Sequence, residues 1–213
     1  MSYHYRGFQP ETDVLKAFDC GKEDLNGFLH EVSSDTPNAT MYEREHLGKT
    51  YIVEEDGSGV ILAYFCLLFD KIERDVANPA IWNRLSRKIP NAKRRSSYPS
   101  LKIGRLAVNK VAQSSGLGQA ILTFIKGWFF KDTKAGCRFL TVDAYLDARE
   151  FYSKCDFAPL VIPEPEDETV LMFFDLWGLA SEWFLQIKRK YRTFVRLCLN
   201  GQIFCKLLVK QRT

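Results

Sequence analysis

Residues 101–129 read LKIGRLAVNKVAQSSGLGQAILTFIKGWF. The start of this segment is mainly apolar, which predicts a strand over residues 101–108. From Leu117 onward the apolar residues recur at helical spacing, which predicts a helix. Between the two lies a glycine-containing loop, QSSGLG at residues 113–118. A loop at a helix N-terminus presents unpaired backbone N–H groups and the positive end of the helix dipole, so this segment predicts a pyrophosphate-binding site.

The loop sequence differs from two widespread phosphate-binding motifs. A Walker A loop ends in Gly-Lys-Ser/Thr and the dinucleotide fingerprint reads G-x-G-x-x-G, and residues 113–118 contain neither. They fit the pattern Q/R-x-x-G-x-G/A at Gln113, Gly116 and Gly118. A second segment follows the next predicted strand, where residues 148–157 read AREFYSKCDF. The two segments together are more specific than either one alone.

In these two segments the chain resembles the GNAT acetyltransferase superfamily, whose loop reads Q/R-x-x-G-x-G/A and whose later segment reads A-x-x-F/L-Y-x-x-x-G-F. The resemblance extends over residues 5–177. Residues 18–21, FDCG, followed by Leu25 and Phe28, are similar to the branch that contains toxin-type, tRNA-acetylating enzymes. The resemblance implies an acyltransferase, an N-acetyltransferase with acetyl-coenzyme A as its cofactor.

The resemblance also implies roles for individual residues. The main chain before the loop would lie beside the pantetheine arm, and a backbone amide near Val108 would polarise the acetyl oxygen. Tyr152 stands at the position of the general acid that protonates the departing thiolate, and a tyrosine with a pKa near 10 keeps its proton at neutral pH. The alternative is that Tyr152 is a packed helix aromatic like Phe151. The implied cofactor-binding residues are Leu106, Ala107, Val108, Gln113, Ser114, Ser115, Gly116, Leu117, Gly118 and Tyr152.

The chain departs from the family pattern at two places. Asp156 replaces the glycine before Phe157, and aspartate tolerates the left-handed backbone that such a turn requires. Asp147 lies where many relatives have a cofactor-contacting asparagine, and with Glu150 it predicts a capping box for the following helix. The conceivable general bases are Asp70, Glu73 and Asp143, none of which is distinguished by its spacing.

The rest of the chain predicts an α/β (α+β) layer fold. Strands are predicted at residues 49–54, 60–69, 137–142 and 170–174, and helices within residues 14–32, after Asn78 and around Phe151. The family resemblance implies a central, mixed, mostly antiparallel sheet of six to seven strands, flanked by helices and splayed between the fourth and fifth strands.

Charge is unevenly distributed along the chain, although the net charge is only +4. Residues 1–177 contain 22 Lys and Arg against 25 Asp and Glu, whereas residues 178–213 contain 8 against 1. We therefore expect an acetyltransferase domain at residues 1–177 and a basic, amphipathic C-terminal extension at residues 178–213. The extension could dock on the domain, a second protomer, nucleic acid or a membrane surface, or have no role.

A basic stretch lies between residues 84 and 95, which contain no acidic residue. It is a possible binding surface for a substrate or nucleic acid, either a tRNA acceptor arm or the 3′-phosphate of the coenzyme. The alternative is a solvated loop. The basic residues are Arg84, Arg87, Lys88, Lys93, Arg94 and Arg95.

Several classes of protein are disfavoured by composition. The six cysteines are scattered without a C-x-x-C pair, which indicates reduced thiols and a cytoplasmic location. The three histidines have no partner at metal spacing, so we expect no metal site. No run of about 18 apolar residues is present, so we expect no membrane span.

Three functions are consistent with these features. The first is transfer of an acetyl group from acetyl-CoA to a primary amine of a small molecule or peptide, by direct attack of the amine. The second is toxin-like acetylation of the amino group of an aminoacyl-tRNA, with a small DNA-binding antitoxin as partner. The third is a non-catalytic module that binds coenzyme A or a protein. The resemblance also makes a homodimer possible, since dimers are common in this family, but the sequence does not determine the oligomeric state.

Overall fold

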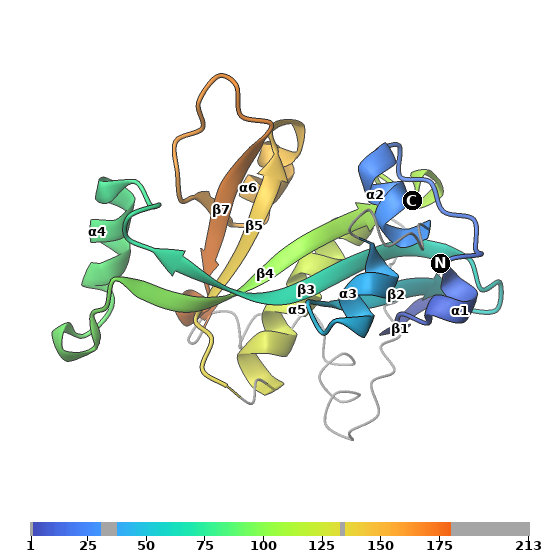
Figure 1. Ribbon diagram of the computed structural model, residues 1–213, viewed down its shortest axis with the longest axis horizontal. Helices are drawn as coiled ribbons and strands as arrows, with labels where there is room; N and C mark the ends of the chain where they lie inside the picture. The colour runs from blue at the N-terminus through green and yellow to red at the C-terminus, as the bar shows by residue number, and fades with distance from the viewer. Residues whose placement is uncertain (1, 31–37, 133–134, 180–213) are drawn as a thin grey trace, which may run out of the picture. The chain divides into compact units, whose positions relative to one another are not determined.

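The computed structural model describes residues 2–30, 38–132 and 135–179, so nearly all of the predicted extension at residues 178–213 lies outside the described residues. Seven strands form one mixed sheet in the order β1-β2-β3-β4-β5-β7-β6 (Figure 1), which confirms the predicted α/β fold. The strands are β1 (Tyr3–Gly7), β2 (Lys49–Glu55), β3 (Ile61–Glu73), β4 (Ser97–Val108), β5 (Phe139–Tyr145), β6 (Ala158–Pro159) and β7 (Thr169–Asp175).

Helices flank the sheet. They are α1 (Pro10–Asp13), α2 (Glu23–His30), α3 (Ala39–Arg44), α4 (Pro79–Arg87), α5 (Leu117–Asp132) and α6 (Arg149–Lys154), with short 3-10 turns η1 (Asn91–Lys93), η2 (Lys110–Ala112), η3 (Leu146–Ala148) and η4 (Leu176–Leu179). Within the described residues, no helix is both long enough and apolar enough to cross a membrane.

The described chain divides into two compact units. The first contains the residues up to Leu67 together with Arg105–Ala120, and the second contains Leu68–Gly104 and Ile121–Gly178. Strands β3 and β4 and helix α5 each pass from one unit to the other. Each unit has its own packed interior.

In the first unit, an antiparallel ladder joins β1 to β2 and β2 to β3. Tyr64 of β3 is fully buried, and its hydroxyl donates a hydrogen bond to the carbonyl of Leu25 in α2 at 2.6 Å. The Tyr64 ring stacks on Phe28 and meets Phe18 edge-on, with centroids 6.0 and 5.4 Å apart. Aromatic burial and this hydrogen bond together attach α2 to the sheet.

In the second unit, β5 pairs antiparallel with β7 along its whole length, and α6 lies beside them (Figure 1). The parallel β4–β5 ladder ends at Ile103 and Val142, although both strands continue, as the expected splay requires. Helix α4 begins as predicted, because the Asn78 side chain accepts from the amides of Ala80 and Ile81. Trp82, on its buried face, stacks on a neighbouring tyrosine of β4.

Some local predictions were wrong. The first short helix is α1, which begins at Pro10, a residue favoured at the first helical position, and ends at Asp13, before the predicted segment begins. The N-cap of α6 is Ala148 and not Asp147, because η3 intervenes, and the Glu150 carboxylate lies 2.7 Å from Lys154 Nζ. Strands β1 and β6 and helix α3 were not predicted, because short elements show little periodicity.

Candidate active site

The glycine-containing loop follows β4 and η2 and leads into α5. Ser114 and Gly116 have positive φ angles of 59° and 84°, and the Ser115 hydroxyl donates to the carbonyl of Ala112 at 2.6 Å. Alternating left-handed backbone of this kind turns successive N–H groups toward one side and forms an anion-binding concavity. A Cβ atom added at Gly116 would meet no atom within 4 Å, so the space beside this residue is open.

The loop fits the pyrophosphate of coenzyme A. Within the described part of the chain, none of the backbone N–H groups of Ser114, Ser115, Gly116, Leu117 and Gly118 donates a hydrogen bond. The first turn of a helix leaves such groups without intrahelical acceptors, and the helix dipole adds positive potential there. An anion with several oxygens would satisfy these donors.

Gln113 has a further role that its motif position does not reveal. Its side-chain amide donates to the carbonyl of Val108 at 3.0 Å and to the carbonyl of Cys20 at 2.9 Å. The amide therefore joins the end of β4 to the segment that precedes α2. Its contact with the cofactor stays a prediction.

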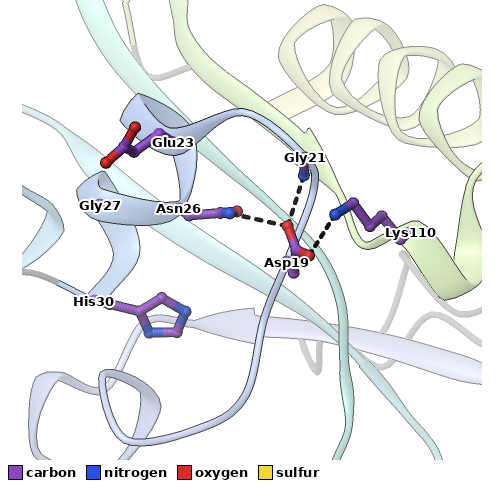
Figure 2. Close-up of a pocket in the computed structure, with 7 residues that line it drawn as sticks. All are labelled: Asp19, Gly21, Glu23, Asn26, Gly27, His30 and Lys110. Atoms are coloured by element: carbon purple, nitrogen blue, oxygen red, sulfur yellow. Dashed lines mark hydrogen bonds and ion pairs between the residues drawn. The ribbon is translucent and has the colours of Figure 1, made fainter.

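A pocket of about 360 Å³ lies against this junction in the first unit (Figure 2). At its centre, one carboxylate oxygen of Asp19 lies 2.6 Å from Lys110 Nζ. The other oxygen accepts from the backbone amide of Gly21 at 2.8 Å and from the side-chain amide of Asn26 at 3.0 Å. These hydrogen bonds, that from Lys110 foremost, lower the pKa of Asp19 to about 2, so the carboxylate is ionised at neutral pH. The lining residues are Asp19, Gly21, Glu23, Asn26, Gly27, His30 and Lys110.

Sequence reasoning missed this pocket. Asp19 and Lys110 are 91 positions apart, and only tertiary folding brings them together. The available signal was the segment FDCG at residues 18–21, which was interpreted only as a branch resemblance. The Lys110 backbone amide also donates to the Asp19 carbonyl at 2.8 Å, so main chain and side chain together bind the segment before α2 to η2.

Asn109 is a second residue that sequence reasoning missed. It is buried, its backbone amide donates to the Leu62 carbonyl at 2.8 Å, and its side-chain amide donates to the Ile61 carbonyl at 3.0 Å. These bonds hold the chain immediately after Val108, where an amide was expected to polarise the acetyl oxygen. Because the Asn109 amide is already bonded to Leu62, it is not the predicted polarising amide, and the role of an amide near Val108 stays a prediction.

Tyr152 lies on α6 in the second unit, with only 6% of its surface exposed. Its ring meets Phe151 and Phe157 edge-on, with centroids 5.1 and 5.7 Å away. Within the described residues its hydroxyl makes no hydrogen bond. Burial raises the pKa of Tyr152 well above the ordinary value, which keeps the phenol protonated at neutral pH. The ring is thus packed, as the alternative interpretation expected, while the hydroxyl retains a proton to donate.

The turn after α6 accommodates the aspartate that replaces the family's glycine. Asp156 has a φ of 63°, the left-handed conformation that glycine and a few polar residues tolerate. The carbonyl of Tyr152 accepts from the amides of both Cys155 and Phe157 at 3.0 Å. The substitution therefore leaves the turn intact, as predicted.

The three conceivable bases all form ion pairs. Lys102 Nζ lies 2.6 Å from a carboxylate oxygen of Asp143 and 3.9 Å from one of Asp70, while Glu73 lies 2.8 Å from Lys71 Nζ. Each carboxylate is thus neutralised by a neighbouring lysine. The geometry singles out none of them as a base.

The basic stretch is exposed along α4 and the loop that follows it, in the second unit. Arg94 differs from the others, because its guanidinium Nε donates to the carbonyls of Ser86 and Ile89 at 3.1 and 3.2 Å and so caps the end of α4. Within the described residues, the remaining cations make no ion pair: Arg84, Arg87, Lys88, Lys93 and Arg95.

A mixed sheet whose fourth strand leads through an anion-binding loop into a helix is the architecture of the acetyl-CoA-dependent acetyltransferases. A sequence profile of the Acetyltransferase (GNAT) family matches residues 21–157. The chain belongs to this family, and it is an acetyltransferase that uses acetyl-CoA as its acetyl donor. No curated protein matches the chain.

Solved structures with this fold include bacterial toxins. AtaT complexed with acetyl-methionyl-tRNAfMet has 26% identity and a TM-score of 0.65, and the match covers 83% of this chain and 96% of AtaT. A mutant of KacT has 24% identity and a TM-score of 0.67, and the match covers 84% of this chain and 98% of KacT. A mutant AtaT toxin bound to the C-terminus of the antitoxin AtaR and acetyl-CoA has 24% identity and a TM-score of 0.61. That match covers 83% of this chain and 95% of the mutant AtaT.

Proposed function

We propose that this acetyltransferase acetylates the amino group of an aminoacyl-tRNA, with Tyr152 as general acid. The observation that carries the proposal is the likeness to AtaT, whose structure contains an acetylated aminoacyl-tRNA. This observation favours the second of the three functions over a small-molecule or peptide amine. A non-catalytic module is not proposed, because the chain belongs to a family of enzymes.

The chemistry requires few groups from the protein. Acetyl-CoA supplies an acetyl group already activated as a thioester. The neutral amine forms a C–N bond to the acetyl carbon, the C–S bond breaks, and Tyr152 donates its phenolic proton to the departing sulfur. Loop amides from Ser114 to Gly118 hold the pyrophosphate, and the main chain of Leu106, Ala107 and Val108 positions the pantetheine arm. The attacking nitrogen loses a proton to solvent, and the Tyr152 phenolate takes one up from solvent, which restores the acid.

The exposed cations of α4 and its following loop support an RNA substrate. Side chains that have no carboxylate partner are available to phosphates, and such contacts bind nucleic acid without reading its sequence. Arg94 is left out of the variant below, because its Nε also caps α4 and its loss would disturb the loop. The cations that we assign to the tRNA backbone are Arg84, Arg87, Lys88, Lys93 and Arg95.

Reversing three of these charges tests the assignment. We expect the triple variant Arg87→Glu, Lys93→Glu, Arg95→Glu to raise KM for aminoacyl-tRNA by about 100-fold, because lost phosphate contacts are replaced by repulsion. The Kd for acetyl-CoA is expected to stay unchanged. The measurement is transfer of labelled acetyl groups to a panel of charged tRNAs, at several salt concentrations.

A matched variant controls for net charge. Arg44, Lys49 and Lys71 are 58–65% exposed and already pair with carboxylates, so reversing all three changes the net charge equally without touching the basic stretch. Its KM for aminoacyl-tRNA should stay close to that of the wild type. If instead the Arg87, Lys93, Arg95 variant loses acetyl-CoA affinity, the stretch serves the 3′-phosphate of the coenzyme. Absence of acetyl transfer to every charged tRNA would refute the proposed substrate.

We also propose an antitoxin as a binding partner, on the strength of the likeness to the AtaT toxin bound to AtaR. Expression of the chain should then arrest translation, and co-expression of the partner should relieve the arrest. The cytoplasmic location, the homodimer and the division into residues 1–177 and 178–213 stay predictions.

A further inference from the structure

Helix α5 contributes a lysine to the interior of the second unit. Lys126 is only 5% exposed, and its ammonium group donates to the carbonyl of Cys155, directly after α6. The nitrogen lies 3.8 Å from the ring centroid of Phe174 and 5.2 Å from that of Phe157. Its nearest carboxylate oxygen belongs to Asp156, 3.8 Å away. Lysines are almost never buried to this extent without a close ionic partner.

These contacts surround the turn that ends the Tyr152 helix. The Cys155 carbonyl belongs to the peptide group that precedes Asp156, the residue in the left-handed conformation. The same turn bonds twice to the carbonyl of Tyr152, and the Phe157 ring packs edge-on against the Tyr152 ring. Lys126 therefore binds both the backbone and one of the rings that orient Tyr152.

Stability does not explain the charge at this position. Burial lowers the pKa of Lys126 to about 8, because the ammonium ion loses its hydration. Asp156 is 83% exposed on its side chain, so its carboxylate offsets little of that cost. A methionine of similar length would fill the space without desolvating a charge, and replacements of this kind are often neutral or stabilising.

We propose that Lys126 is a positioning residue: its ammonium group holds the turn after α6 and thereby keeps the Tyr152 hydroxyl in the orientation that proton donation requires. This inference rests on the proposed acid role of Tyr152. Lys126 itself touches neither the cofactor nor the reacting atoms in this scheme.

The first test replaces Lys126 by methionine. We expect kcat to fall by about 10-fold and KM for acetyl-CoA to stay within about twofold. The melting temperature should change little, because removal of a desolvated charge offsets the lost hydrogen bond to the Cys155 carbonyl. Lys126→Gln keeps a donor for the Cys155 carbonyl and is expected to retain about a third of the wild-type kcat. The control is Lys154→Met, the same substitution at a lysine of α6 whose side chain is 71% exposed. A fall in melting temperature and a rise in KM, without a change in kcat, would show a purely structural role and overturn the inference.

The second test separates this inference from the acid role. In a Tyr152→Phe background, Lys126→Met should have no further effect on kcat, because the group that it positions is gone. If Lys126→Met lowers kcat equally in both backgrounds, Lys126 does not act through Tyr152. If Tyr152→Phe is fully active, the proposed acid role itself fails. If only Lys126→Met is fully active, the positioning role alone fails.

A pH profile tests the charge. The ionisable groups that face Lys126 are the Asp156 carboxylate and the Cys155 thiol. The wild-type ammonium should lose its proton near pH 8, so the ratio of wild-type kcat to Lys126→Met kcat should fall toward 1 between about pH 7 and about pH 10. A ratio that stays constant over this interval would exclude a role for the charge.

Discussion

Replacing Tyr152 by phenylalanine is expected to lower kcat by about 10²- to 10⁴-fold, the usual contribution of a general acid. The substitution removes one oxygen from a ring that is otherwise held by Phe151 and Phe157, so the packing should persist. Because the hydroxyl bonds to no other group in the described residues, its loss should cost little stability. The Kd for acetyl-CoA should change by less than about threefold, since the pyrophosphate donors are backbone amides of another segment.

The control for Tyr152→Phe removes a hydroxyl group from another buried tyrosine of the second unit. Tyr98 is buried, and its hydroxyl accepts from the Arg95 amide at 2.9 Å, so Tyr98→Phe leaves that amide without its partner. We expect Tyr98→Phe to lower the free energy of unfolding by about 1 kcal/mol and to leave kcat unchanged. Pre-steady-state release of free thiol, measured for both variants, separates the chemical step from product release. A Tyr152→Phe enzyme with wild-type thiol release would contradict the acid role.

Replacing Gly116 by valine is expected to weaken acetyl-CoA binding by about 100-fold, because two effects combine. Gly116 has a φ of 84°, which a β-branched residue adopts only with strain, so the loop backbone should shift. The new side chain would also add bulk beside the loop amides, where a Cβ atom meets nothing within 4 Å. Calorimetric titration with acetyl-CoA measures the effect directly.

Gly57 offers a matched control for this experiment. It lies in the β2–β3 turn with a φ of 87°, and a Cβ atom there also meets nothing within 4 Å. Gly57→Val should therefore introduce similar strain and lower the melting temperature by a similar amount. Its affinity for acetyl-CoA should match that of the wild type. Equal affinities for the two valine variants would mean that the loop backbone does not bind the pyrophosphate.

Much of the fold was predictable because local chemistry and tertiary structure agree. Asn78 and the following proline mark the start of α4, and the side chain of Asn78 caps it as expected. Asp156 was predicted to tolerate a left-handed turn, and its φ is 63°. The predicted N-cap at Asp147 was wrong, because an intervening 3-10 turn makes Ala148 the N-cap and moves the helix start to Arg149. Cap signals of this kind compete with other short-range turns, which sequence spacing alone does not rank.

The candidate site was predictable only in part. The loop from Gln113 to Gly118 was found because a phosphate-binding helix N-terminus depends on consecutive residues. The Asp19–Lys110 pair and the Asn109 bonds to β3 were missed, because they join segments that are distant in sequence. The basic stretch was found as a whole, but the capping role of Arg94 depends on the path of the loop back toward α4.

The sequence by itself determined the order of strand, loop and helix and the anion site between them, because backbone donors at a helix N-terminus are specified locally. The acetyl donor followed from the resemblance of two sequence segments to the GNAT family. Only the tertiary structure decided that Gln113 closes the loop onto Cys20, that Asp19 meets Lys110, and that Lys126 is buried beneath the Tyr152 turn. Burial and long-range pairing depend on how distant segments pack, and a lysine on a helix has the same local sequence signal whether it faces solvent or the interior.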